Sequence, residues 1–384
     1  MTTSSDQRVS EGYLLLADIS GYTAFLTGTE LEHAHAIIRE LTKLIRSRLT
    51  PPMKFVKLEG DAVFCYAGAN AFNDGERFVE LIEVCYFDFA NRLQDMTRAT
   101  TCKCDACKAI PTLGLKFVTH FGSFMIEEDD GREDLAGPDV ILVHRFLKNT
   151  ISDGVGPDAY AFFTEACQKR LPSGFALPRH LESYESFGEI AGGVHDLQPV
   201  LEQMRDARTV YVSAEDADFD VRFETAFAPE VVWQYFVDPD KRLRWQGPVQ
   251  TAVTAEPNPG GRMGAGASTH CAHGEGNADG LREYLDWRPF SYFTNRYTSL
   301  RNGNEGPFLE AMESTEFTPL EDGGTAVNYR IRIEDRSVSA LRKFDEAEWV
   351  ADTRKLFPLA WIPLNKLMEE DGFTISGPEP VTDA

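Results

Sequence analysis

A short apolar run that ends on a carboxylate is the feature that most constrains the fold of this chain. Residues 13–17 read Tyr-Leu-Leu-Leu-Ala, a run that fits a buried strand and is too short for a helix. Asp18 follows directly, and Gly21 breaks the strand. Because a carboxylate at the end of a buried strand is costly unless a partner compensates it, this strand end is predicted to be a cation site.

A second carboxylate occupies a tight turn. Residues 55–58 and 62–67 are predicted strands, joined by Glu59-Gly60-Asp61. If Asp18 and Asp61 converge from neighbouring strands, they form a hard-oxygen site that suits Mg²⁺ or Mn²⁺ with a triphosphate. Two unrelated turn aspartates would show the same spacing, so spacing alone leaves both interpretations open.

The elements around these aspartates predict an α+β fold. Helical spacing covers residues 30–49, 78–93 and 138–149, and a strand over 113–126 is expected to be interrupted at Gly122. The order is strand, helix, hairpin, helix, strand, helix. It favours a ferredoxin-like α/β sandwich with helices on one face of a mainly antiparallel sheet.

The length of 384 residues predicts two domains. We expect the first over residues 10–200, a charged linker over 201–217, and a second domain over 218–370. All five tryptophans lie in the second part. Its predicted elements are a strand at 220–226, a helix at 229–236, several strands to about residue 333, and a long final helix near 343–370.

Composition excludes several classes of protein. The formal net charge of −23 argues against nucleic-acid binding, which needs a basic face. A nucleotide ligand stays compatible with this charge when divalent metals neutralise the carboxylates and phosphates. No apolar run approaches the roughly 20 residues of a membrane span, and the polar start lacks the layout of a signal peptide. These features predict a cytoplasmic protein without a membrane span.

Three of the seven cysteines crowd together as Cys102, Cys104 and Cys107. They are candidate ligands of a structural Zn²⁺ ion, with Cys65, Cys85 or a histidine as the fourth ligand. The alternative is a group of reduced thiols in a loop, with a redox role. His33 and His35, near a helix start, are predicted to be solvated.

Four segments resemble motifs of the class III nucleotidyl cyclases over about residues 10–200. They are Ala17-Asp18-Ile19-Ser20-Gly21-Tyr22-Thr23, Lys57-Leu58-Glu59-Gly60-Asp61, Phe117-Val118-Thr119-His120-Phe121-Gly122, and Asp134-Leu135-Ala136-Gly137-Pro138-Asp139-Val140 continuing to Arg145. The resemblance implies a cyclase-type sandwich whose site forms between two such domains. Because this chain has one, a homodimer with two composite sites is expected.

The resemblance also implies roles for individual residues. Asp18 and Asp61 would bind two Mg²⁺ or Mn²⁺ ions, helped by the carbonyl of Ile19. Lys57 and Asp134 would read adenine, so ATP would be the preferred nucleotide and cyclic AMP the product. Arg145 would stabilise the transferring phosphate. The turn after the strand would contribute to nucleotide binding through Gly21, Tyr22 and Thr23.

One position departs from the cyclase pattern. Ile141 stands where the family has a ribose-orienting asparagine, and residues 190–197 show no counterpart of a late phosphate-binding lysine. The alternative function is therefore a catalytically degenerate protein that binds nucleotide or lipid and acts as a regulator.

The second part resembles the START/polyketide-cyclase-like (SRPBCC) superfamily. The resemblance rests on Phe227-Ala228-Pro229-Glu230-Val231-Val232-Trp233, Gly260-Gly261-Arg262-Met263-Gly264-Ala265-Gly266 and Glu283-Tyr284-Leu285-Asp286-Trp287-Arg288-Pro289-Phe290. It implies a helix-grip domain, in which a curved antiparallel sheet surrounds a long C-terminal helix and leaves a cavity for a hydrophobic small molecule or lipid. Candidate lining residues are Tyr292, Phe293, Tyr297, Phe308, Phe317, Phe357 and Trp361. The alternative is that these aromatic side chains fill the core.

Overall fold

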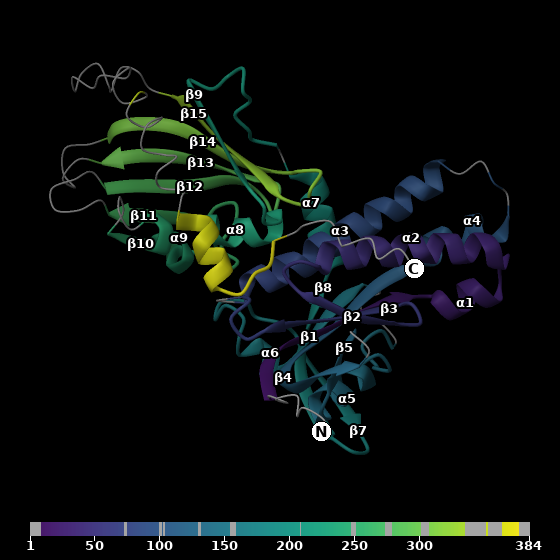
Figure 1. Cartoon of the computed structure of the whole chain (residues 1–384). Coiled ribbons are helices and arrows are strands. Elements are labelled where there is room, and N and C mark those ends of the chain that lie inside the picture. Colours follow the sequence, from purple (N-terminus) through teal and green to yellow (C-terminus); the bar gives the residue numbers. More distant parts are fainter. Residues whose placement is uncertain are drawn as a thin grey trace. The chain divides into compact units, whose positions relative to one another are not determined.

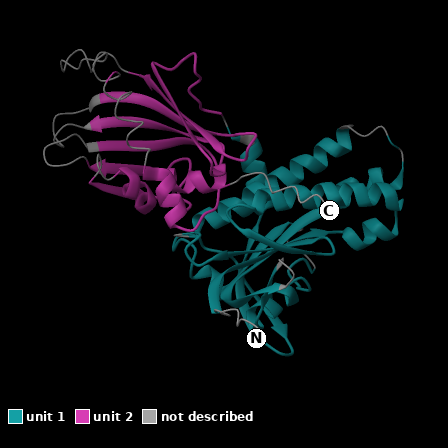
Figure 2. Cartoon of the chain, in the orientation of Figure 1, with its two compact units in different colours: residues 1–207 teal, residues 208–384 magenta. Residues whose placement is uncertain are grey.

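The computed structural model describes residues 9–72, 75–99, 102, 104–129, 132–153, 159–207, 209–246, 251–272, 279–300, 307–334, 351 and 363–375. The chain divides into two compact units, residues 1–207 and 208–384 (Figure 2). The division falls inside the segment predicted as a linker. No helix in the described part of the chain is long and apolar enough to cross a membrane.

Unit 1 is a mixed α+β unit, as predicted, and its principal elements follow the expected order. The elements are β1 (Val9–Ser20), α1 (Tyr22–Thr27), α2 (Leu31–Leu49), β2 (Lys54–Glu59), β3 (Ala62–Gly68), α3 (Glu76–Ala99), α4 (Asp105–Ala109), η1 (Ile110–Thr112), β4 (Gly114–Asp129), β5 (Arg132–Ala136), α5 (Pro138–Arg145), β6 (Tyr160–Thr164), α6 (Glu165–Gln168), β7 (Arg179–Tyr184), β8 (Gly188–Asp196) and α7 (Gln198–Asp206).

The strands of unit 1 form one sheet in the order β2-β3-β1-β4-β6-β8-β7, with β5 paired to β4. The β4–β6 pair is parallel, and the other pairs are antiparallel. The central position of β1, between β3 and β4, explains its uninterrupted apolar sequence, because a strand covered on both faces has no side that alternates toward water.

Helices cover both faces of this sheet, which corrects the prediction of helices on one face. Leu14 and Leu16 pack in a cluster with Val143 of α5. Tyr13 points to the opposite face and contacts Phe78 of α3, with ring centroids 4.9 Å apart. On that face α2 and α3 lie side by side (Figure 1).

Two element boundaries also differ from prediction. The strand β4 runs unbroken through Gly122, and α5 ends at Arg145 rather than at residue 149. The carboxylate of Asp139, at the start of α5, occupies the place where a side chain at residue 122 would lie. The glycine therefore admits a neighbouring side chain and does not interrupt the strand.

Unit 2 contains a second sheet, against which the helices at residues 229–237 and 239–246 pack. Its elements are β9 (Phe219–Thr225), α8 (Pro229–Val237), α9 (Pro239–Gln246), β10 (Ala252–Glu256), β11 (Ser268–Ala272), β12 (Asp279–Arg288), β13 (Tyr292–Leu300), β14 (Pro307–Pro319) and β15 (Thr325–Ile333). The sheet order is β10-β11-β12-β13-β14-β15-β9, and every pair is antiparallel.

Trp233 of α8 forms the centre of the core of unit 2. Its indole is fully buried and lies 5.6 Å from the ring of Phe293 and 5.3 Å from that of Phe317, between ring centroids. Of the long C-terminal helix predicted for 343–370, residues 363–370 are described as helical. The helix-grip arrangement remains a prediction, since most of that segment lies outside the described residues.

Candidate nucleotide and metal site

The first candidate metal ligand, Asp18, lies at the end of β1 and faces a lysine from the neighbouring strand. Residues 18 and 116 pair across β1 and β4. The Nζ atom of Lys116 lies 3.2 Å from Oδ2 of Asp18 and donates to the carbonyl of Leu147 at 3.3 Å. Sequence reasoning missed Lys116, because the register that brings it to Asp18 joins segments far apart in the chain.

The second candidate ligand, Asp61, is held in the two-residue turn between β2 and β3. Gly60 takes a φ of 67°, which glycine adopts without strain, and lets the chain reverse there. The carboxylate of Asp61 is 9% exposed and accepts a hydrogen bond from the backbone N–H of Ile19. The structure therefore brings Asp61 next to the end of β1, as the sequence predicted.

The environment of Asp61 disfavours its negative charge. Burial, and next the nearby carboxylate of Asp18, raise the pKa of Asp61 to about 7, against the lowering effect of backbone hydrogen bonds and Lys116. A buried carboxylate that resists ionisation beside a second carboxylate is well matched to a divalent cation, which would stabilise the negative charge of Asp61.

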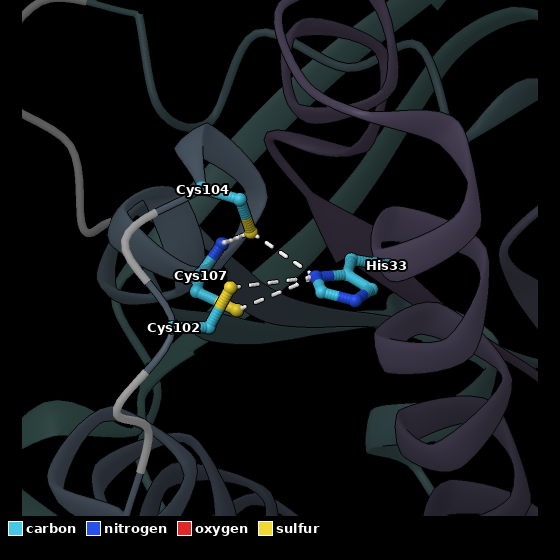
Figure 3. Close-up of side chains that lie close together, drawn as sticks. All are labelled: His33, Cys102, Cys104 and Cys107. Atoms are coloured by element: carbon cyan, nitrogen blue, oxygen red, sulfur yellow. Dashed lines mark hydrogen bonds between the residues drawn. The ribbon is translucent and has the colours of Figure 1, made fainter.

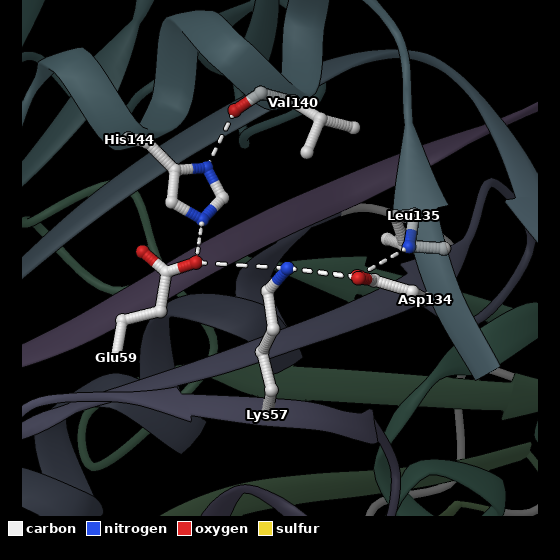
Figure 4. Close-up of polar contacts among 6 residues, drawn as sticks. All are labelled: Lys57, Glu59, Asp134, Leu135, Val140 and His144. Carbon is white, nitrogen blue, oxygen red and sulfur yellow. Dashed lines mark hydrogen bonds and ion pairs between the residues drawn. The ribbon is translucent and has the colours of Figure 1, made fainter. Parts of the chain in front are cut away.

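The two predicted purine-reading residues, Lys57 of β2 and Asp134 of β5, also meet. The Nζ atom of Lys57 lies 2.9 Å and 3.0 Å from the two carboxylate oxygens of Asp134 (Figure 4). Burial acts to raise the pKa of Asp134, but hydrogen bonds from Lys57 and from the Leu135 N–H hold it below its usual value. The side chains are 39% and 50% exposed, so both are accessible to a ligand.

Glu59 and His144 extend this polar group and were given no role by sequence reasoning. Glu59 lies 3.7 Å from Lys57 and 2.8 Å from Nε2 of His144 (Figure 4). The other ring nitrogen of His144 lies 2.6 Å from the carbonyl of Val140, one turn earlier in α5. These contacts tie the β2 strand that carries Lys57 to the helix that carries Arg145.

The last predicted catalytic residue, Arg145, is exposed at the end of α5. Ile141 lies one turn earlier on the same helix and is 54% exposed. The turn after β1 is open to solvent as well: Gly21, with a φ of 84°, and Thr23 are exposed, and Tyr22 is partly exposed.

Comparison with known proteins gives a match to the family model described as "Protein of unknown function (DUF2652)" over residues 38–154. An "Uncharacterized protein Rv2561/Rv2562" of Mycobacterium tuberculosis is 31% identical over 148 residues. That alignment covers 38% of this chain and 66% of the relative, so the chain spans slightly less than two thirds of the relative's length.

Solved structures similar to about half of the chain include adenylyl and guanylyl cyclase domains. The adenylyl cyclase CyaB from P. aeruginosa aligns with a TM-score of 0.40 and 13% identity, over 50% of this chain and 97% of CyaB. The Mll3558 protein from Rhizobium loti aligns with a TM-score of 0.28 and 21% identity, over 37% of this chain and 93% of Mll3558.

The cysteine cluster lies outside the cyclase-like motifs, and the side chain that it contacts is a histidine. Cys102, Cys104 and Cys107 face one edge of the imidazole ring of His33, at the start of α2 (Figure 3). His33 is exposed, as predicted, and in addition lies against the three cysteines, a contact that was not predicted. Cys65 and Cys85, predicted as alternative fourth ligands, are buried in the core on β3 and α3 and do not belong to the group.

The aromatic residues predicted to line a pocket in unit 2 do not share one environment. Phe293 and Phe317 are buried against Trp233, and Tyr297 lies on the same sheet face as Phe293. Tyr292 points to the opposite face, where its hydroxyl donates to Asp286 at 2.7 Å, so it cannot line the same cavity. The Phe308 side chain, Phe357 and Trp361 lie outside the described residues.

A buried polar group shares the sheet face of Phe293 and Tyr297. Glu313 accepts from Arg282 at 2.9 Å, from Asn295 at 2.8 Å and from the Tyr329 hydroxyl at 2.6 Å. Arg282 and Asn295 hold the pKa of Glu313 below its usual value although burial acts to raise it. This interior therefore offers polar as well as apolar contacts.

Proposed function

We propose that this chain binds a nucleoside triphosphate together with Mg²⁺ or Mn²⁺, with ATP preferred, and converts it into a cyclic nucleotide. The observation that carries the proposal is the meeting of Asp18 and Asp61 at the end of β1, with the Asp61 carboxylate anchored on the backbone N–H of Ile19. Their motifs resemble those of the class III cyclases, which supplies the reaction class.

The donors at this position fit a hard divalent cation. Asp18, Asp61 and the carbonyl of Ile19 offer oxygen atoms only, which Mg²⁺ and Mn²⁺ prefer. Metal bound there would neutralise the triphosphate and favour ionisation of the attacking hydroxyl. In the reaction, the 3′-hydroxyl oxygen bonds to the α-phosphorus as pyrophosphate leaves, and the hydroxyl proton passes to solvent or to a carboxylate.

The Lys57–Asp134 pair supports adenine as the base. A lysine donor beside an aspartate acceptor matches the N1 atom and the 6-amino group of adenine, which are neighbours on one edge of the ring. The ligand would replace the ion pair between the two side chains, and both are exposed enough to be reached.

A homodimer would complete the site. Arg145 is exposed at the end of α5. The Arg145 side chain of one copy could therefore reach a phosphate bound at the aspartates of the other copy. We propose a head-to-tail pair with two composite sites, in which the metal-binding aspartates of one copy meet Lys57, Asp134 and Arg145 of the other.

The test is product formation by the purified full chain with Mn²⁺ and each of the four ribonucleoside triphosphates, followed by mass spectrometry of cyclic products. We expect cyclic AMP to predominate and the Asp61→Ala variant to lose it. Absence of product with every nucleotide at high protein concentration would refute the enzymatic function. Product that persists in Asp61→Ala would refute the site.

A non-catalytic nucleotide-binding regulator is the second candidate, and Ile141 favours it. An apolar side chain cannot form the hydrogen bond that would orient the ribose, and loss of one positioning contact can slow a reaction about a hundredfold. Saturable, Mn²⁺-dependent binding of ATP without any cyclic product would favour this candidate.

For unit 2 we propose a ligand-binding module that regulates unit 1. The support is an interior face that combines Phe293 and Tyr297 with the Arg282–Glu313 pair, which would suit a hydrophobic small molecule or lipid bearing a polar group. Native mass spectrometry of freshly purified protein should show a co-purified small molecule. A mass equal to that of the bare chain in every preparation would contradict the proposal.

A further inference from the structure

Four metal-ligating side chains converge between two segments that are far apart in the sequence. His33 comes from the first turn of α2, whereas Cys102, Cys104 and Cys107 come from the start of α4 and the residues before it. Their ligand atoms all lie within 4.8 Å of one another. Figure 3 shows the three sulfur atoms facing the same edge of the imidazole ring.

The distances within the group agree with tetrahedral coordination. Nδ1 of His33 lies 3.1 Å from the sulfur of Cys104, 3.8 Å from that of Cys102 and 4.0 Å from that of Cys107. A zinc ion about 2.3 Å from sulfur and about 2.0 Å from nitrogen, at the tetrahedral angle, separates these two atoms by about 3.5 Å. One ring nitrogen cannot hydrogen-bond well to three thiols at once, so the three-fold convergence fits a shared cation better than hydrogen bonding alone.

Hydrogen bonds from backbone N–H groups to side chains hold the cysteine segment in this position. Cys104 caps the start of α4, where its sulfur accepts a hydrogen bond from the N–H of Cys107 at 3.4 Å. Glu30, the residue before α2, accepts from the N–H groups of Asp105 at 3.2 Å and Ala106 at 3.1 Å. The start of α2 is thus already tied to α4 beside the four ligands.

We propose that Cys102, Cys104, Cys107 and His33 bind a structural Zn²⁺ ion. Three thiolates and one imidazole fill the four positions of tetrahedral zinc and leave none open for a substrate, which is the pattern of a structural site. Soft sulfur ligands select zinc against the hard cations suited to Asp18 and Asp61. The assignment of zinc to this group does not depend on the proposed nucleotide chemistry.

The ion would fix a segment that supports the turn after β1. The chain passes from α4 through η1 to β4, and a Cβ atom at Gly21 would lie 2.8 Å from the carbonyl oxygen of Thr112 in η1. The η1 backbone thus packs directly on Gly21, close to Asp18. Zinc at the start of α4 would stabilise this contact by restraining α4 against α2.

The test is the metal content of the purified full chain, expressed with zinc present and handled under reducing conditions without chelator. We expect about one zinc per chain in the wild type, and less than about 0.2 in His33→Ala and in Cys104→Ser. The matched control is His35→Ala, an exposed histidine on the same helix that is outside the group, and it should keep its zinc.

Two further measurements test zinc binding by these residues even if one of the variants fails to fold. The His33→Cys variant supplies a fourth thiolate and should retain zinc. The wild-type chain loaded with Co²⁺ should show the intense visible bands of a tetrahedral ion and the charge-transfer band of thiolate ligation. Zinc-free protein with the three thiols reduced, an octahedral cobalt spectrum, or a disulfide among these cysteines in freshly purified protein would each overturn the proposal.

Discussion

Asp61 combines burial with a like-charged neighbour, and this makes stability and the proposed metal binding depend on pH. Its pKa is raised to about 7 in the folded chain, whereas an unfolded aspartate titrates near 3.8. Between these pH values the folded chain holds a proton that the unfolded chain has released. The metal-free protein therefore loses stability as the pH rises from about 4 to about 7.

We expect Asp61→Asn to remove this loss. At pH 8 and without metal, the variant should be more stable than the wild type by on the order of 2 kcal/mol, and the difference should vanish below pH 4. Thermal unfolding at both pH values in the presence of chelator measures this. The same variant should lose Mn²⁺ binding. The exposed Asp95 provides a control, since Asp95→Asn should leave both curves unchanged.

Ile141 offers a gain-of-function test of the catalytic proposal. It is 54% exposed on α5, one turn before Arg145, so Ile141→Asn should not disturb the core. If the site is a cyclase site that lacks one ribose contact, the variant should form product about 10 to 100 times faster. Ile141→Ala is the matched control, because it removes the apolar side chain without adding an amide. Equal rates in both variants would contradict the role assigned to this position.

At the scale of elements, Gly122 couples β4 to α5. A Cβ atom there would lie 2.3 Å from a carboxylate oxygen of Asp139, which accepts from the N–H of Ser123 at 2.7 Å. We expect Gly122→Ala to displace Asp139 and to destabilise unit 1 by about 1–3 kcal/mol, as measured by urea unfolding. Gly68→Ala, at the end of β3, meets no atom within 4 Å and should be nearly neutral. A neutral Gly122→Ala would contradict this coupling.

The same elements show which features of the fold can be predicted from local sequence patterns. The apolar run ending at Asp18 and the Gly60 turn predicted β1 and the β2–β3 hairpin, because these signals lie within a few consecutive residues. The apolar run also carried the information that both faces of β1 are covered, since it has no polar alternation. Gly122 was misread as a break, because the side chain that fills its space comes from another element.

Local patterns did not predict which residues meet when distant segments of the chain pair. Lys116 faces Asp18 only through the β1–β4 register, and His33 meets the cysteines only because α2 starts beside α4. The Lys57–Asp134 pair was proposed from motif resemblance, and the structure shows the two in contact. Element order was therefore predictable, whereas the partners of individual side chains depended on tertiary packing.

At the scale of the whole molecule, the proposed function depends on two copies of the chain. Mixing two inactive variants tests this dependence. Activity can return only if each site is built from residues of both copies. Asp61→Asn would remove a proposed metal ligand, and Arg145→Ala would remove the proposed phosphate contact. In a heterodimer of these variants with composite sites, one site collects both defects and the other collects none.

Co-expression of the two variants should therefore restore about a quarter of the wild-type rate, since about half of the dimers are mixed and each mixed dimer has one intact site. The rate of cyclic AMP formation measures this, and the Ile141→Asn background can be used to raise the signal. Co-expression of Asp61→Asn with Asp18→Asn is the control, because both defects fall on the same half of every site and no rate should return. A mixture of Asp61→Asn and Arg145→Ala that stays inactive, although native mass spectrometry shows the mixed dimer, would place all the essential groups of a site on one chain.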